Sequence, residues 1–478
     1  MEPDAVWTQY KPFECRVILR RCSKFMGTRF GHAMKRDIEQ TLRTWKDEPR
    51  RYPLLVRGAR QVGKSFSIRT FGQEEFPGLI EINFEQQPQF LSCFDSLEPS
   101  EIIQNLSILS KSEIIPGKTL LFLDEIQECP RAITALRYFY EQMPALHVIG
   151  AGSLLEFVMS QEDFKMPVGR VQYLYMKPLS FLEFLDASGE HNARALIESM
   201  TWDSLPSPAV HQHLISLVRK YALVGGMPAV VSEHVSSGNL EKCLQIQSII
   251  VQTYRDDFGK YASKVKTKYL QKMFYAVPKM VGRKLKYAHV DGTLQSRDLK
   301  EALELLAQAG VVHRIKRTSG EGLPLEASAK ERQFKAAFLD VGLMQNMCGL
   351  SSDLLTSADD GFIRINEGAV AEQYVAQELL AYRDNTLAPS LFYWAREARN
   401  SNAEIDYLVP CGSGALPIEV KAGKTGTLRS MHLYLDTYPI SIGVRVSQRS
   451  FNESLPILSI PFYAIRRIEA LAMDILSR

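Results

Sequence analysis

The chain of 478 residues is long enough for several domains, and its hydrophobic content of 45% is that of an ordinary globular protein, which excludes a disordered or low-complexity chain. Its formal charge of +3 and pI of about 8.3 are too small to indicate nucleic-acid binding by themselves, so any basic surface must be local. No apolar run reaches the roughly 18 residues that cross a bilayer, and seven scattered cysteines without C-x-x-C spacing predict reduced thiols and no zinc site. We therefore expect a cytoplasmic protein without a membrane segment.

Residues 1–33 are predicted to be an N-terminal extension. Five basic residues surround a short apolar patch, while Glu2, Asp4 and Glu14 argue against a transit peptide. An amphipathic arm and a chance upstream extension of the reading frame are the two alternatives.

Strands and helices alternate from residue 34 to about residue 185. The strands are expected near Leu54 and at 79–83, 120–123, 147–149 and 171–175. Such alternation predicts an α/β fold in which helices cover both faces of a parallel sheet.

The first of these strands leads into a Gly-x-x-x-x-Gly-Lys-Ser motif, which is the spacing of a nucleoside triphosphate cradle. Glycines at both ends allow successive backbone N–H groups to face one anion at the start of the following helix. Lys64 is expected to reach the β and γ phosphates, and Ser65 to hold Mg²⁺. The residues predicted to bind ATP are Gly58, Ala59, Arg60, Gln61, Val62, Gly63, Lys64, Ser65 and Phe66.

A second motif at 118–129, KTLLFLDEIQEC, supplies carboxylates to this site. Its apolar run is typical of a strand buried on both faces, and it ends in Asp124 and Glu125, as a Walker B strand does. Asp124 is predicted to support the magnesium and Glu125 to polarise the attacking water. The alternative is a strand that meets an acidic helix cap.

Ser153 follows the fourth predicted strand in the run Gly-Ala-Gly-Ser. Ligands of open α/β sheets lie at the carboxyl ends of the strands, so Ser153 is a candidate sensor of the γ phosphate. It is equally suited to cap the helix that begins at Leu154, and both roles can hold at once.

The order of motifs resembles that of the prokaryotic AAA-type ATPases that carry a C-terminal domain of unknown function. The motifs are RGARQVGKS, INFE, LLFLDEIQECP, GAGS, GR, MKPLSFLEFL, YALVGGMPAVV and YRDDFGKY, and the resemblance covers 34–478. It implies an AAA+ P-loop core at 34–185, a helical lid at 186–260, a winged-helix segment at 261–335 and a restriction-endonuclease-like domain at 336–478.

The resemblance also implies a homo-oligomeric ring, such as a hexamer, in which an arginine completes the neighbouring site. Arg170 is the candidate finger, but spacing alone does not choose between Arg170, Arg137 and Arg131, and a structural arginine is the alternative. The mixed charges at 254–257 predict a solvated or subunit-facing surface.

Basic charge is concentrated between residues 260 and 317, with 14 Lys and Arg against 4 Asp and Glu. A helical pattern at 296–309, a strand at 311–315 and a glycine turn at Gly320 predict a winged helix, with DNA as a candidate partner. Acidic residues on the same helix oppose a deep major-groove position, and subunit packing is the alternative. The candidate phosphate contacts are Lys279, Arg283, Lys284, Lys286, Arg297, Lys300, Arg314, Lys316 and Arg317.

The C-terminal region contains a second candidate site in the order helix, strand, strand. A helix at 367–382 turns Glu372 toward its apolar stripe, and strands at 403–409 and 416–421 place Asp406, then Glu419 and Lys421, each on one face. This set resembles the D…E-x-K site of restriction-like nucleases. The resemblance implies Mg²⁺ on Asp406 and Glu419, with Glu372 and Lys421 completing the catalytic set. A relic that uses these groups as buried ion pairs is the alternative.

Three functions fit these patterns. The chain is predicted to be an ATP-driven ring that binds and remodels or cuts DNA, an ATPase switch that acts on a protein partner through an inert nuclease-like module, or a metal-dependent nuclease gated by nucleotide.

Overall fold

The computed structural model describes residues 34–153, 155, 169–261, 264–350, 367–396, 403–423 and 428–478. The N-terminal extension predicted at 1–33 lies outside the described residues. Among the residues that the structure describes, no helix combines the length and the apolar character that crossing a membrane requires.

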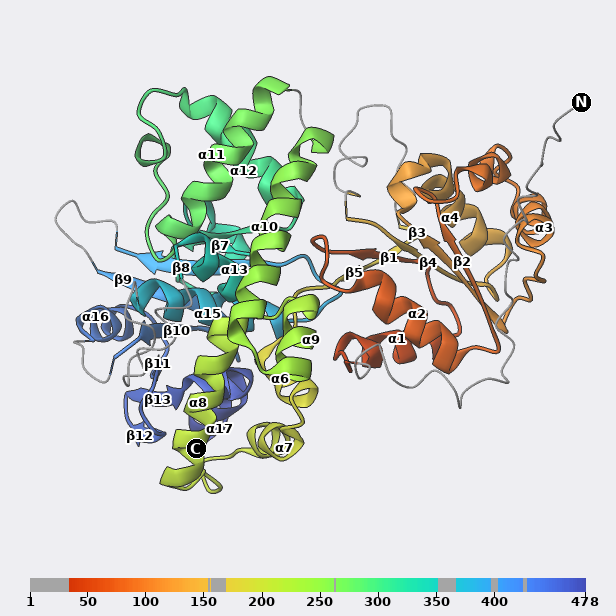
Figure 1. Ribbon diagram of the computed structural model, residues 1–478. Coiled ribbons are helices and arrows are strands. Elements are labelled where there is room, and N and C mark those ends of the chain that lie inside the picture. The colour runs from red at the N-terminus through yellow and green to blue at the C-terminus, as the bar shows by residue number, and fades with distance from the viewer. Residues whose placement is uncertain are drawn as a thin grey trace, which may run out of the picture.

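A five-stranded parallel sheet forms the centre of the N-terminal half (Figure 1). All five predicted strands are present, and their spatial order is β2-β3-β4-β1-β5. Their bounds are β1 Leu54–Arg57, β2 Gly78–Asn83, β3 Thr119–Asp124, β4 His147–Ala151 and β5 Gln172–Tyr175.

Helices cover both faces of this sheet, as the alternating pattern predicts. Helices α1 (Ile38–Asp47) and α2 (Lys64–Glu75) lie on one face and α3 (Pro99–Ser110) and α4 (Pro130–Gln142) on the other, with short 3₁₀ turns η1 (Pro88–Phe94) and η2 (Ile126–Glu128). Every residue of β3 is buried, because alternate side chains enter the core clusters of opposite faces.

The register of the strands aligns the ends that carry the site. Asn83 of β2 pairs with Asp124 of β3, Asp124 pairs with Ala151 of β4, and Ala151 pairs with Val56 of β1. The loop that follows β1 and the carboxylates that follow β3 therefore meet at one edge, with the end of β4 between them.

Five helices follow the first sheet: α6 (Phe181–Ala187), α7 (His191–Ser199), α8 (Pro208–Val224), α9 (Pro228–Ser237) and α10 (Leu240–Tyr261). Helix α6 begins with a capping box, in which Ser180 and Glu183 each accept a hydrogen bond from the backbone N–H of the other. Gly225 ends α8 at a φ of 75°, a conformation that glycine adopts without a steric penalty.

The basic segment contains the predicted helix and the predicted two-stranded hairpin. The elements are α11 (Lys264–Met280), η3 (Tyr287–His289), α12 (Ser296–Gln308), β6 (Val312–Thr318), η4 (Leu325–Ser328) and β7 (Lys330–Phe338), followed by α13 (Val341–Met347). Strands β6 and β7 pair in antiparallel fashion.

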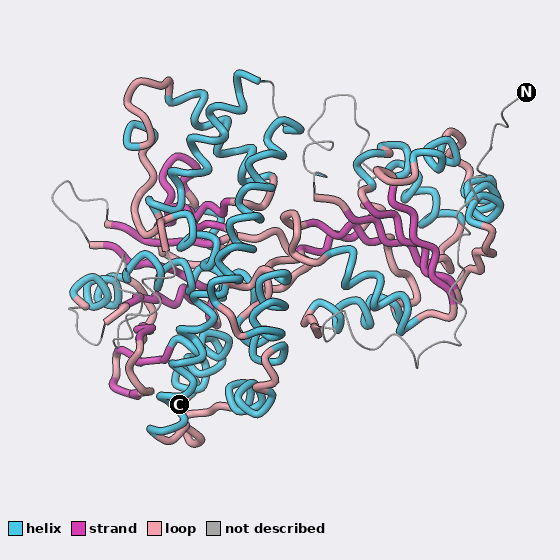
Figure 2. The backbone as a smooth tube through the Cα atoms, viewed as in Figure 1, coloured by secondary structure: helices cyan, strands magenta, loops and turns pink. Residues whose placement is uncertain are grey.

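This hairpin is part of a second sheet of eight strands, in the order β12-β13-β11-β10-β9-β8-β6-β7. Figure 2 shows the strands of the two sheets as two separate groups. Strand β6 joins it by parallel pairing with β8. The other strands are β8 (Leu391–Ala395), β9 (Glu404–Cys411), β10 (Gly414–Lys421), β11 (Gly443–Ser447), β12 (Asn452–Ser454) and β13 (Ile457–Pro461). Helices α15 (Glu367–Ala381), α16 (Arg429–Thr437) and α17 (Ile468–Ser477) and the turn η5 (Phe462–Arg467) complete this half.

The two halves are joined by hydrogen bonds that follow strand β5. The backbone N–H of Tyr175 donates to the carbonyl oxygen of Asn385 over 2.7 Å. The N–H of Phe181 donates to both carboxylate oxygens of Glu378, which is 1% exposed, over 3.0 and 3.1 Å. The second half therefore fixes the path of the chain directly after the first sheet.

His147 is a buried histidine at the start of β4 whose surroundings require the neutral ring. The guanidinium of Arg51 can only donate, so its contact of 3.3 Å makes Nδ1 an acceptor and places the proton on Nε2. Nε2 then donates to the carbonyl oxygen of Lys46 over 3.2 Å. Burial, with the Arg51 charge adding to it, lowers the pKa of His147 to about 4.

Acidification is expected to destabilise the protein through His147. The pKa of His147 is lower in the folded state than in the unfolded chain. The free energy of unfolding that the neutral ring contributes is therefore complete above pH 6.5 and is lost as the pH falls toward 4. The shift corresponds to about 3 kcal/mol. Urea unfolding at a series of pH values should show this slope, and His147→Gln should flatten it. An equal slope in both proteins would contradict the assignment.

Candidate functional site

The P-loop between β1 and α2 has the backbone geometry that its glycines permit. Gly58 and Gly63 have φ values of 144° and 96°, and a Cβ on Gly58 would lie 2.1 Å from the carbonyl oxygen of Met176. Gln61 also has a positive φ, of 62°. Only glycine is accommodated at Gly58, because a side chain there would clash with the chain that follows β5.

Lys64 lies inside the loop and is 7% exposed. Its ammonium donates to the carbonyl oxygens of Gly58 and Ala59, over 2.9 Å in each case. Burial lowers the pKa of Lys64 to about 8, against the opposing effect of the Glu125 and Asp124 charges.

Side chains from distant elements hold two further carbonyl groups of the loop. Arg36, which precedes α1, donates from Nη1 to the carbonyl oxygen of Val62 over 2.9 Å. The hydroxyl of Tyr254 in α10 donates to the carbonyl oxygen of Arg60 over 2.5 Å, and Arg60 pairs with Asp257 over 2.9 Å. Tyr254 is 2% exposed, so the prediction of a solvated surface at 254–257 is wrong for this residue.

Asp124 lies against the first turn of α2, as the Walker B pattern predicts. The hydroxyl of Ser65 donates to its Oδ1 over 3.0 Å, and the amide of Asn83 donates to its Oδ2 over 3.1 Å. Burial raises the pKa of Asp124, although both hydrogen bonds oppose this effect. A hydroxyl and a carboxylate side by side are oxygen ligands of the kind that Mg²⁺ prefers.

Glu125 follows in a left-handed conformation with a φ of 48°. Its Oε2 accepts a hydrogen bond of 2.6 Å from the amide of Gln127. Gln127 also lies against the end of β4, since a Cβ on Gly152 would be 2.0 Å from its Oε1. Sequence reasoning gave no role to Asn83 or Gln127, and the run INFE was the only signal for Asn83.

Ser153 lies beyond the end of β4 and is 7% exposed. Within the described residues its hydroxyl has no hydrogen-bond partner. A buried hydroxyl normally has one, and this hydroxyl lies at the same sheet edge as Lys64 and Asp124. The helix that it was predicted to cap lies largely outside the described residues.

The three candidate arginines lie away from the P-loop of their own chain. Arg170 precedes β5, at the end of the sheet opposite to the P-loop, and its Nε is 2.9 Å from Oε1 of Glu141. Arg137 contacts the same oxygen over 3.1 Å. Arg131 donates to the carbonyl oxygen of Phe94 over 2.8 Å. Arg137 is exposed, Arg170 is partly exposed, and both contact Glu141, whereas Arg131 holds a local turn.

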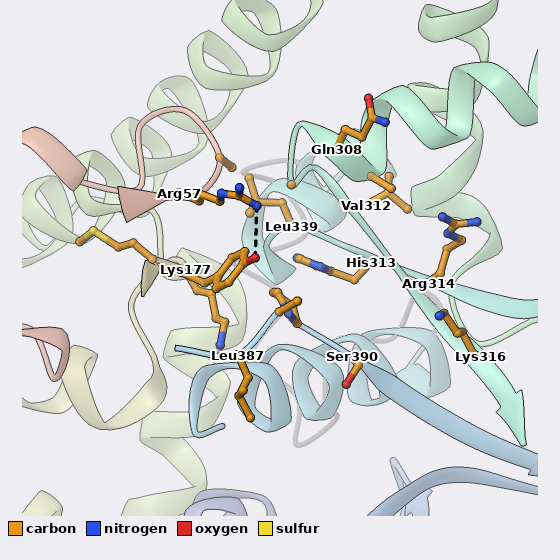
Figure 3. Close-up of a pocket in the computed structure, with 18 of the residues that line it drawn as sticks. Arg57, Lys177, Gln308, Val312, His313, Arg314, Lys316, Leu339, Leu387 and Ser390 are labelled. Atoms are coloured by element: carbon orange, nitrogen blue, oxygen red, sulfur yellow. Dashed lines mark hydrogen bonds between the residues drawn. The ribbon is translucent and has the colours of Figure 1, made fainter. Parts of the chain in front are cut away.

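A cavity of about 1030 Å³ opens beside the P-loop and separates the first sheet from α12 and β6 (Figure 3). Gly58, Ala59 and Ser153 line one side, and His313, Arg314 and Lys316 of β6 line the other. The turn between α12 and β6 touches the P-loop, because a Cβ on Gly310 would lie 3.3 Å from the backbone nitrogen of Ala59.

The structure brings the four predicted C-terminal residues into one region, around a lysine that sequence reasoning missed. The ammonium of Lys335 lies 3.1 Å from Oε2 of Glu372 and 3.2 Å from Oδ1 of Asp406. Glu419 contacts Lys421 over 2.7 Å. Lys335 lies on β7, far from the other members in sequence.

Much of the local basic charge is paired within the chain. Five of the nine candidate phosphate contacts are engaged within the chain. Four of them lie within 4 Å of a carboxylate, namely Lys284, Lys300, Arg314 and Lys316. The fifth, Arg317, donates hydrogen bonds to the carbonyl oxygen of Ala395. Lys279, Arg283, Lys286 and Arg297 are exposed and form no ion pair with any described residue. No carboxylate of the described residues neutralises these four cations.

Three family models match the chain. Residues 50–185 match the AAA domain, residues 215–354 match a domain of unknown function (DUF8612), and residues 367–463 match another (DUF4143). The first match and the geometry of the P-loop identify an AAA-type P-loop domain. No curated protein matches the chain.

Solved structures of P-loop proteins are similar at low identity. A Walker-type ATPase of Pyrococcus abyssi is 17% identical over 66% of this chain and 96% of its own, with a TM-score of 0.42. The ORC1 protein of Aeropyrum pernix in complex with DNA is 14% identical over 65% and 90%, with a TM-score of 0.28. The RuvB Holliday junction branch migration motor of Thermotoga maritima is 15% identical over 58% and 88%, with a TM-score of 0.26. At these TM-scores the three structures assign no function.

Nucleotide affinity is expected to fall as the pH rises above 8. Lys64 titrates near that value in the free protein, and phosphates beside it would raise its pKa, so binding takes up a proton above pH 8. Calorimetry of ATP binding at about pH 9 in buffers of different ionisation enthalpy measures this uptake directly. Lys64→Arg keeps the positive charge, but its side chain does not titrate near pH 9, so ATP binding to this variant should take up no proton. Equal proton uptake by both proteins would contradict the assignment to Lys64.

Proposed function

We propose that this AAA-type protein binds ATP with Mg²⁺ at the P-loop and hydrolyses it. The observation that carries the proposal is the contact of 3.0 Å between Ser65 and Asp124, with the Ser153 hydroxyl, which has no hydrogen-bond partner among the described residues, at the same edge of the sheet. This edge of the sheet thus brings together oxygen ligands suited to Mg²⁺, the Lys64 ammonium and the Ser153 hydroxyl, where we place the three phosphates.

Each residue has a defined role in this proposal. Backbone N–H groups of the loop and Lys64 hold the phosphates, and Ser65 and Asp124 hold Mg²⁺, which when bound neutralises phosphate charge. Glu125 orients a water and takes its proton as the water oxygen bonds to the γ phosphorus and the bond to the β-phosphate oxygen breaks. Gln127 positions the Glu125 carboxylate.

Replacing Glu125 by glutamine should abolish turnover while leaving binding intact. The amide keeps the size of the side chain but cannot accept a proton, so the hydrolysis rate should fall about 10²- to 10⁴-fold. Phosphate release measures the rate, and calorimetry measures ATP affinity. Glu128→Gln, at an exposed carboxylate three residues away, is the matched control. An unchanged rate in Glu125→Gln would remove this role.

The proposal includes assembly into a ring in which Arg170 acts on the neighbouring chain. Its support is the position of Arg170 at the end of the sheet opposite to its own P-loop, where it is partly exposed and pairs with Glu141. An arginine in that position has no access to the phosphates of its own chain. Arg137, beside it, remains the alternative finger.

We further propose that ATP turnover is coupled to DNA through the basic segment. The support is the set of four exposed cations that form no ion pair with a described residue: Lys279, Arg283, Lys286 and Arg297. A switch that acts on a protein partner is the second candidate, favoured by the pairing of the other basic side chains within the chain. Stimulation of hydrolysis by DNA supports the first candidate, and stimulation only by a protein supports the second.

Replacing Lys279, Arg283, Lys286 and Arg297 by glutamate should weaken binding to any DNA sequence. Each phosphate contact that is lost should lower the slope of log affinity against log salt by about one unit. Fluorescence anisotropy with labelled duplex at about 50 mM salt measures both quantities. Lys300→Glu, at a cation that is already paired with Glu304, is the control. Equal affinity before and after reversal would remove the DNA proposal.

A further inference from the structure

The cavity beside the P-loop has polar side chains on both of its walls, and each half of the protein supplies one wall (Figure 3). Lys177, which follows β5, belongs to the first half, whereas His313 of β6 and Ser390, which precedes β8, belong to the second. The volume of about 1030 Å³ is at the upper limit of the roughly 300–1,000 Å³ typical of small-molecule sites. A ligand of ordinary size could therefore contact both walls at once.

Positive charge predominates on these walls. Among the described residues, four cationic and two anionic side chains line the cavity. Both carboxylates are paired: Glu304 lies 3.6 Å from the ammonium of Lys300. Glu326 lies 2.5 Å from that of Lys316. Lys177 forms no ion pair with any described residue, and burial lowers its pKa to about 8, so its ammonium remains largely charged at neutral pH. The cavity thus contains a cation that lacks a carboxylate partner in the described part of the chain.

Several hydrogen-bonding groups in the cavity lack a protein partner among the described residues. The ammonium of Lys177 donates to the carbonyl oxygen of Leu380, which leaves its other N–H donors unused. The side chains of His313 and Ser390 form no hydrogen bond with a described residue. Burial, with the Lys177 charge adding to it, lowers the pKa of His313 to about 4, so these two groups are electrostatic neighbours and the ring is neutral at neutral pH. Polar groups in such a place require water or a ligand.

An anion with several acceptor oxygens matches these donors. The ammonium of Lys177, one N–H of the His313 ring and the hydroxyl of Ser390 can all donate. A phosphate group accepts hydrogen bonds on each of its free oxygens, and its charge offsets that of the lysine. The rim of the cavity is apolar at Leu323 and Leu387, which are 39% and 64% exposed. These side chains would contact the organic part of a phosphate ester.

We propose that this cavity binds the phosphate group of an organic phosphate between Lys177 and His313, with Ser390 as a further donor. The site is separate from the nucleotide site, which lies at the end of the cavity that Gly58 and Ser153 line. Two sources offer the same chemistry, namely a small phosphate monoester and the phosphodiester backbone of a single nucleic-acid strand. The inference requires neither ATP hydrolysis nor contact between DNA and the basic segment.

Calorimetric titration of the full chain with inorganic phosphate tests this inference. The P-loop is first saturated with Mg²⁺ and the β,γ-imido analogue of ATP, which fills the γ-phosphate position. We expect one phosphate to bind per chain, with a Kd of about 1 mM or lower. Lys177→Met removes the charge and should weaken phosphate binding about ten- to a hundredfold. Lys177→Arg keeps the charge and should lose less affinity.

Two further variants separate the site from general effects of charge and stability. His313→Phe removes the ring N–H from the opposite wall and should weaken phosphate binding about two- to tenfold. Lys118→Met removes an exposed ammonium that does not line the cavity and should bind phosphate as the native protein does. Circular dichroism checks the fold of each variant, and His313→Phe decides alone if Lys177→Met does not fold.

The inference is overturned if the native protein shows no saturable phosphate binding, or if folded Lys177→Met or His313→Phe binds phosphate with native affinity. Failure of the ATP analogue to bind would instead remove the proposed nucleotide site. Phosphate would then be titrated into Lys64→Met, which lacks the P-loop ammonium, and the same results would decide.

Competition identifies the source of the phosphate group. Phenyl phosphate carries a monoester, and a thymidine trinucleotide without terminal phosphates carries only diesters. Displacement of inorganic phosphate by the trinucleotide assigns the site to a nucleic-acid strand, and displacement by phenyl phosphate alone assigns it to a small ligand. Displacement by neither compound contradicts an organic phosphate as the ligand.

Discussion

The orientation of the P-loop carbonyl groups is the constraint on which the nucleotide site depends. Lys64 holds the carbonyl oxygens of Gly58 and Ala59, Tyr254 holds that of Arg60, and Arg36 holds that of Val62. Because each carbonyl group is fixed by a donor, the intervening N–H groups are left to face an anion. A loop without these donors would turn partial negative charge toward the phosphates.

Two of these donors come from outside the loop, so the site is not a local property of residues 58–65. Arg36 precedes α1 and Tyr254 lies on α10, the long helix that runs between the two sheets (Figure 1). The turn at Gly310 touches Ala59 from the second half. The P-loop therefore contacts both α10 and the α12–β6 turn directly.

Sequence patterns predicted those parts of the two candidate sites that depend on residues close together in the chain. Glycine spacing and an apolar run ending in carboxylates were enough to find Lys64, Ser65 and Asp124, and period-two alternation placed Asp406 and Glu419 on their strands. Lys335 could not be found in this way, because it is separated by 37 and 71 residues from the carboxylates it contacts. Its strand carries other charges, and only the fold shows which of them is buried.

The pairing of β6 with β8 has a consequence for how the chain can be divided. Strand β6 lies in the segment that matches DUF8612, and β8 lies in the segment that matches DUF4143. Cutting the chain between them would expose the hydrogen-bonding groups of β8, whose five residues are all buried. Such apolar edges recruit strands from other molecules. Either fragment alone would tend to aggregate, so the two segments are expected to fold as one unit.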